Sequence, residues 1–76
     1  MADGYIIELT NPPAAEGKPV KEIWYAHIPD RKRAIKAVRR VARAGKGVVV
    51  DIIRVESHRI LLERLALLEG EVRPEY

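Results

Sequence analysis

Residues 30–45 read DRKRAIKAVRRVARAG, and this stretch decides the fold. At 100° per residue, its aliphatic side chains fall on one side and its basic side chains on the other, which predicts an amphipathic helix over residues 30–44. Pro29 suits the first turn of such a helix, and the acid Asp30 suits the positive end of its dipole. Gly45 is well placed to end it as a left-handed cap.

Three segments around this helix have the pattern of β-strands. Residues 5–9 alternate, with the odd-numbered side chains on one face, and residues 20–28 alternate in the same way. Residues 48–55 are apolar on both faces and mostly β-branched, which is typical of a central strand covered on both sides. The order strand, helix, strand predicts a right-handed crossover with the second and third strands parallel.

A second helix is predicted over residues 58–68, with Ser57 as its N-cap. Leu67 lies off the apolar stripe of this helix, so either the helix ends before it or Leu67 contacts another element. The stripe expected to face the core consists of Leu61, Leu62, Leu65 and Leu68.

These elements predict an α+β fold with the order β-β-α-β-α, in which a three-stranded mixed sheet carries two helices packed on it. The 76 residues form one small domain, residues 1–76, with a flexible loop at 10–19 and a polar tail at 71–76. One face of the sheet would still carry apolar groups. Because uncovered apolar faces usually find a partner and so short a chain has a marginal core, we expect a homodimer.

Charge is distributed very unevenly along the chain. Of its fourteen Lys and Arg residues, eight lie in residues 31–46, and none of its eleven acids does. The net charge of +3 therefore combines one strongly cationic element with an acidic remainder. Concentrated positive charge attracts phosphates or acidic protein surfaces, so this element is the main functional indication.

The outer face of the predicted helix is the candidate contact surface for an anion or for RNA or DNA. Residues that could read bases are scarce, because the chain has no glutamine and only Trp24 and Tyr25 could stack on bases, from alternate faces of one strand. Binding to a nucleic acid is therefore expected to show weak sequence selectivity. The candidate contact residues are Lys32, Lys36, Arg39, Arg40, Arg43 and Lys46.

The sequence offers little for catalysis. It has no cysteine, and its single serine, Ser57, is better placed for capping than for nucleophilic attack. Neither histidine lies in a metal-binding spacing, so no metal, cofactor or small-molecule substrate is expected. Asp51 interrupts an apolar strand, where a carboxylate needs a partner or water. That partner is either an arginine or, in a catalytic interpretation, His27 as the other half of an acid–base pair.

The sequence shows neither a signal peptide nor an apolar run long enough to cross a membrane, so a cytoplasmic protein without membrane association is expected. The leading interpretation is a non-enzymatic binding domain that acts through self-association or a protein partner. The first alternative is weakly selective nucleic-acid binding through residues 31–46. The second alternative is an enzyme that uses the pair of Asp51 and His27.

Overall fold

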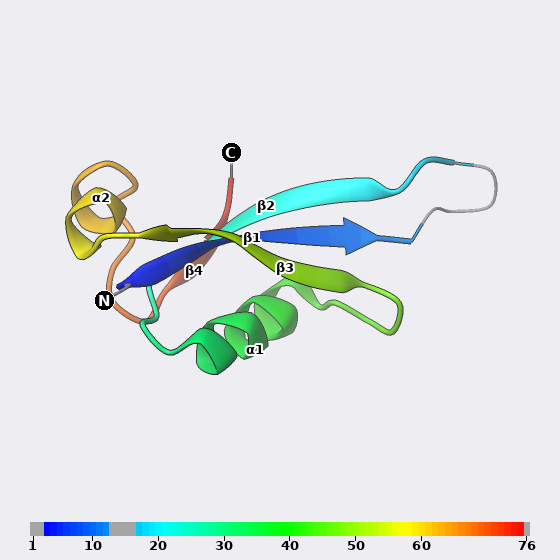
Figure 1. The fold of residues 1–76 in the computed structure, drawn as a ribbon, viewed down its shortest axis with the longest axis horizontal. Helices are drawn as coiled ribbons and strands as arrows, with labels where there is room; N and C mark the ends of the chain where they lie inside the picture. The colour runs from blue at the N-terminus through cyan, green and yellow to red at the C-terminus, as the bar shows by residue number, and fades with distance from the viewer. Residues whose placement is uncertain (1–2, 13–16, 76) are drawn as a thin grey trace.

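The computed structural model describes residues 3–12 and 17–75. The elements of this part of the chain form an elongated body with extents of 41 × 22 × 18 Å (Figure 1). In chain order they are β1 (Gly4–Asn11), β2 (Val20–Ala26), α1 (Arg31–Ala42), β3 (Val49–Glu56), α2 (His58–Glu63) and β4 (Val72–Pro74).

The sheet is four-stranded and antiparallel, in the order β3-β1-β2-β4. The α+β class is confirmed, but the three-stranded mixed sheet is wrong. The strands β2 and β3 do run in the same direction, yet β1 lies between them and pairs antiparallel with both. The fourth strand, β4, comes from the segment predicted as a polar tail, and β1 extends into the segment predicted as a loop. Residues 13–16 of that loop lie outside the described residues.

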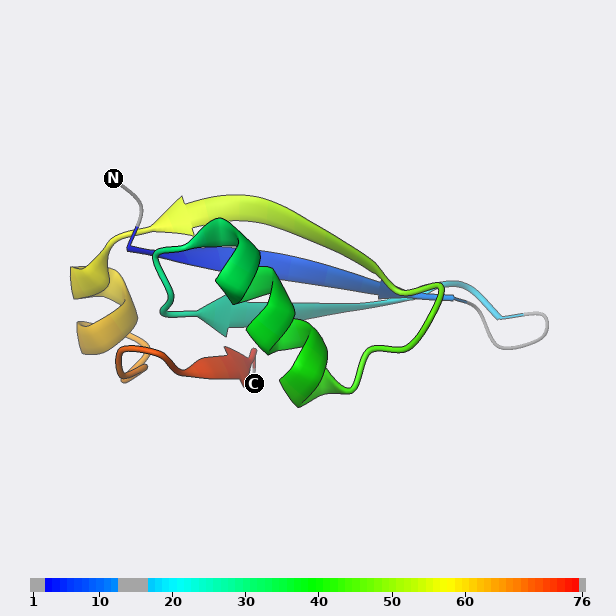
Figure 2. The same cartoon turned by 90° about the horizontal axis from the view of Figure 1, so that it is seen from below.

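The helix α1 lies across one face of the sheet, and the core forms between them (Figure 2). The predicted alternation of β1 is confirmed, because its odd-numbered side chains Tyr5, Ile7 and Leu9 are buried. Trp24 and Ala26 from β2 extend this layer, and the side chains of α1 that close it are Ala34 and Val38.

In contrast to the prediction, β3 is an edge strand and is not covered on both sides. Its Val49, Ile53 and Val55 are each more than half exposed. The interior strands are β1 and β2, and β1 forms hydrogen-bonded ladders along nearly its whole length on both sides. Within the described residues, no helix covers the sheet face opposite α1, which we call the helix-free face.

The start of α1 lies within one residue of the prediction, and its end comes two residues early. Asp30 is the N-cap, and its carboxylate accepts a hydrogen bond from the backbone N–H of Arg33 at 3.0 Å. The left-handed C-cap is Arg43, with φ 55°, rather than Gly45. The helix closes earlier because the N–H groups of Arg43 and Ala44 fold back onto the last carbonyls of α1.

The second helix, α2, begins with the predicted cap at Ser57 but ends at Glu63, well before residue 68. Leu61 and Leu67 are buried, whereas Leu62 and Leu68 of the predicted stripe are exposed. The chain after α2 makes an irregular turn whose carbonyl groups accept hydrogen bonds from side chains of other elements, so the helix does not continue. No helix among the described residues is long and apolar enough to cross a membrane.

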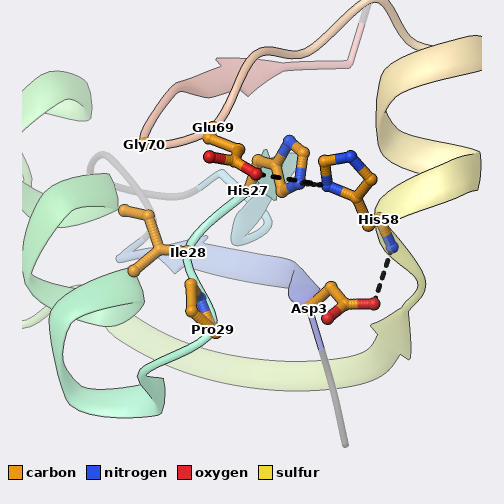
Figure 3. A pocket seen from close by; sticks show the side chains of 7 residues that line it. All are labelled: Asp3, His27, Ile28, Pro29, His58, Glu69 and Gly70. Atoms are coloured by element: carbon orange, nitrogen blue, oxygen red, sulfur yellow. Dashed lines mark hydrogen bonds and ion pairs between the residues drawn. The ribbon is translucent and has the colours of Figure 1, made fainter.

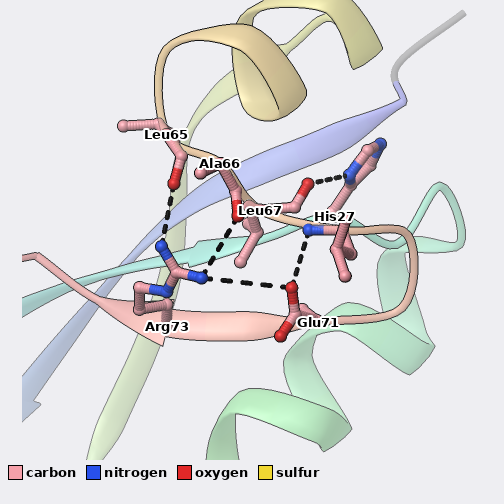
Figure 4. Close-up of polar contacts among 7 residues, drawn as sticks. His27, Leu65, Ala66, Leu67, Glu71 and Arg73 are labelled. Atoms are coloured by element: carbon pink, nitrogen blue, oxygen red, sulfur yellow. Dashed lines mark hydrogen bonds and ion pairs between the residues drawn. The ribbon is translucent and has the colours of Figure 1, made fainter.

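Figure 4 shows which side chains hold this turn. The guanidinium of Arg73 donates hydrogen bonds to the carbonyls of Leu65 at 2.8 Å and Ala66 at 3.2 Å. The imidazole of His27 contacts the carbonyl of Leu67 at 2.7 Å. The turn is thereby fixed to β4 and to the end of β2.

Candidate nucleic-acid interface and the histidine pair

The predicted contact residues gather on the outer surface of α1 and the turn that follows it. All of them are exposed to solvent, and we call them together the six-cation surface. Its members are Lys32, Lys36, Arg39, Arg40, Arg43 and Lys46.

Within residues 3–12 and 17–75, no member of the six-cation surface lies in an ion pair with a carboxylate. The helix itself contains no acid, and the carboxylate that caps it, Asp30, is engaged with a backbone N–H. One member of the six-cation surface makes a side-chain hydrogen bond: the Arg39 guanidinium donates to the carbonyl of Val48 at 3.3 Å. The positive charge of the surface is therefore not neutralised by the described part of the same chain.

One side of α1 borders a hollow of about 540 Å³. Its basic lining comes from Arg33, Lys36 and Arg40, which lie on the same side of the helix, and Gly70 lies across from them. Of the two acids next to Gly70 in sequence, Glu71 accepts the N–H of Leu68 at 2.7 Å, whereas Glu69 is 80% exposed and its carboxylate lies 3.7 Å from the Nδ1 of His58. Arg33 was not among the predicted contact residues, and the structure places it in the lining of this hollow.

Among the residues that the structure describes, side chains that could read bases do not reach the six-cation surface. Trp24 is only 6% exposed and belongs to the core, so it is not available for stacking. Tyr25 lies on the helix-free face and donates a hydrogen bond to Glu75 at 2.7 Å. The amide of Asn11 is bonded to Glu22 at 2.9 Å. The chemistry that α1 presents is thus positive charge without stacking groups.

A second polar group lies beyond the end of β2 (Figure 3). His27 is 2% exposed, and its Nε2 lies 2.8 Å from the Nδ1 of His58. The backbone N–H of His58 donates to Asp3 at 2.9 Å, and the carboxylate of Glu69 lies 3.7 Å from the His58 Nδ1. These four residues line a hollow of about 250 Å³ that shares Ile28 and Gly70 with the basic hollow beside α1.

The hydrogen bonds assign the tautomers of the two histidines. The carbonyl of Leu67 only accepts, so the Nδ1 of His27 must carry a proton. A neutral His27 then has an Nε2 that accepts, and His58 must donate to it from its own Nδ1. The chain of bonds leaves the Nε2 of a neutral His58 unprotonated.

The predicted meeting of Asp51 and His27 is not observed. Asp51 is exposed and lies opposite Glu8 in the ladder between β1 and β3, whereas His27 follows β2 and contacts His58. The acid–base alternative therefore loses the geometry on which it depended. In the described ranges, no group of three or more His, Cys, Asp or Glu residues is placed to hold a metal ion.

Sequence reasoning missed the histidine pair because its members are 31 residues apart and belong to different elements. The available signal was that His27 follows a strand end and His58 opens a helix directly after another strand. Only the strand order brings these two positions to the same end of the sheet.

Comparison of the chain with protein-family models, with curated proteins and with solved structures returned no match.

Proposed function

We propose that the chain is a non-enzymatic binding module that contacts the phosphate backbone of RNA or DNA through the six-cation surface. Contact with phosphates releases counterions condensed on the nucleic acid, and this release supplies most of the free energy of non-specific binding. The observation that carries the proposal is the absence of carboxylate partners for these cations within the described residues. Internal ion pairs would have reduced that free energy.

The conformation of Arg43 also supports the proposal. It is the C-cap of α1 in the left-handed region, with φ 55°, where glycine is usual. A side chain in this region costs roughly 1–2 kcal/mol. Strained backbone conformations cluster at functional sites. The strained residue here carries one of the charges of the six-cation surface.

The proposed binding mode has little base selectivity. The aromatic groups of β2 are buried or on the helix-free face, so contact through α1 would be made to phosphates and not to base edges. The hollow beside Arg33, Lys36 and Arg40 is large enough for phosphate groups between α1 and Gly70. We therefore expect similar affinities for strands of unrelated sequence.

Fluorescence anisotropy with a labelled RNA strand at about 50 mM salt tests the proposal. The test variant combines Lys36→Gln, Arg40→Gln and Arg43→Gln. Loss of three phosphate contacts is expected to weaken binding on the order of a thousandfold. The matched control combines Lys18→Gln, Lys21→Gln and Arg64→Gln, which remove the same charge from exposed positions away from α1, and is expected to weaken binding by less than about tenfold.

Equal losses in the two triple variants would refute a localised surface, because binding would then follow net charge alone. A competition arm distinguishes the kind of partner. Polyglutamate that displaces the RNA at equal charge concentration would contradict the proposal in favour of an acidic protein. Inorganic phosphate and unlabelled DNA complete the series, and DNA is expected to compete far better than free phosphate.

A further inference from the structure

The outer edge of β3 is the most exposed apolar feature of the sheet. This eight-residue strand pairs with β1 on one side only, and three of its aliphatic residues are more than half exposed: Val49, Ile53 and Val55. An edge with free N–H and C=O groups and apolar side chains is a template for pairing with another strand. The opposite edge, β4, has only three residues and includes Pro74, so it is protected in the usual way.

A β-bulge in β3 changes which of its side chains share a face. The register between β1 and β3 shifts at Ile6 and Ile7, so Ile53 is an extra residue in the strand. Asp51 lies opposite Glu8, and Arg54 lies opposite Ile6, which places both charged residues on the helix-free face. Without the bulge, alternation would put them on opposite faces.

Asp51 lacks a favourable partner within the described part of its own chain. Its cross-strand neighbour is Glu8, which carries the same charge and is itself paired with Lys21 at 3.8 Å. Like charges directly opposite each other destabilise a sheet. Arg54 is paired with Glu56 at 3.2 Å but its side chain is 72% exposed, so its guanidinium is accessible from the outer edge.

We propose that two copies of the chain pair antiparallel through the outer edges of β3, about a two-fold axis at Ile52. The bulge makes Asp51 and Arg54 one ladder step from Ile52 in opposite directions. A two-fold axis at that point sets each Asp51 opposite the partner subunit's Arg54. On the other face it sets Val50 opposite the partner subunit's Val55, and the two Ile52 side chains against each other.

Self-complementarity favours a second copy over an unrelated strand. The pairing brings opposite charges together twice and covers Val55, which is 58% exposed, on both edges. It also places a cation beside Asp51, which otherwise lies opposite Glu8. A chain of 76 residues gains stability from such a partner because its own core is small.

The dimer would join the two four-stranded sheets into one continuous sheet. A two-fold axis perpendicular to a sheet keeps each face on its own side, so both α1 helices would lie on the same side. The dimer would therefore present two six-cation surfaces on one side. A role for them in binding nucleic acid rests on the proposed function, whereas the pairing of the edges does not. The test of the pairing therefore contains no nucleic acid.

Light scattering after gel filtration at high micromolar concentration measures the mass of the wild type and of two single variants. The wild type is expected at twice 8.6 kDa. Asp51→Arg and Arg54→Asp each place like charges across the axis, so each is expected at the monomer mass. Circular dichroism checks that both variants are folded, and Leu68→Lys, at a residue 60% exposed outside β3, is the control expected to remain dimeric.

Mixing the two single variants gives the decisive result. One subunit then carries two cations on its β3 edge and the other two anions, so an equimolar mixture is expected to regain the dimer mass. The double variant, Asp51→Arg with Arg54→Asp, is expected to dimerise alone. A monomeric wild type, single variants that remain dimeric, or a mixture that stays monomeric would each overturn the proposed pairing.

Discussion

Replacing Arg43 with glycine is predicted to change stability and binding in opposite directions. Arg43 holds the left-handed C-cap of α1, at φ 55°, where a residue with a side chain is strained by roughly 1–2 kcal/mol. Glycine removes that strain but adds about 0.5–1 kcal/mol of backbone entropy to the unfolded chain. Loss of a cation from the negative end of the helix dipole lowers the free energy of unfolding by about 0.3 kcal/mol more.

With the middle of each range, the strain exceeds the other two contributions together, so Arg43→Gly is expected to stabilise the fold by about 0.5 kcal/mol. For a domain of this size that raises the melting temperature by roughly 4–8 °C per kcal/mol, which circular dichroism resolves. The same variant loses one phosphate contact. At about 50 mM salt, one contact fewer is expected to weaken RNA binding by roughly tenfold.

Ala66→Gly is the matched control, because Ala66 is also in the left-handed region, at φ 50°, but carries no charge and lies after α2. It is expected to stabilise the fold by a similar amount and to leave RNA binding unchanged. The reasoning fails if Arg43→Gly lowers the melting temperature, or if it raises stability with no loss of binding. It fails equally if Ala66→Gly weakens binding as much as Arg43→Gly does.

Three further predictions follow from the polar contacts and the packing. His58→Ala leaves a buried acceptor on His27 unpaired and is expected to lower the free energy of unfolding by about 1–3 kcal/mol in a denaturant titration. Nitrogen NMR of the wild type at pH 8 should show both imidazoles protonated at Nδ1, and a His27 protonated at Nε2 would contradict the assignment. A methyl group at Gly4 would press against the last carbonyl of β2, so Gly4→Ala is expected to cost about 1–3 kcal/mol or more, and a melting temperature equal to that of the wild type would contradict the packing. The hydrogen bond to Glu75, together with partial burial, raises the pKa of Tyr25 above its ordinary value of 10.0. Because the folded state holds the proton more tightly, the free energy of unfolding is expected to fall as the pH rises through and above 10. If Tyr25→Phe shows the same fall in stability as the wild type, this assignment is refuted.

The parts of the fold that were predictable from the sequence are those that depend on neighbouring residues. The amphipathic pattern of α1 and the cap of α2 at Ser57 are local features, and each lies where the pattern indicates. The end of α1 was mispredicted because Arg43 accepts a conformation that intrinsic preference assigns to Gly45.

Strand order could not be predicted, because a run of β-branched residues has the same pattern at an edge as in the centre. The apolar residues on both faces of β3 indicated a central strand, whereas part of that pattern comes from the extra residue at Ile53 and from exposed Val49 and Val55. The strand β4 is too short to give a periodic signal. The candidate contact residues share one exposed surface, since they follow from helix geometry, but the contact between His27 and His58 depends on the tertiary fold.

The dependence of RNA affinity on salt tests the central claim most directly. If the six-cation surface meets the phosphates of a single strand, the logarithm of the association constant is expected to fall against the logarithm of salt concentration with a slope of about −4. Between 50 and 200 mM salt this is a loss of roughly 250-fold. A slope shallower than about −1 would mean that α1 is not where a polyanion binds.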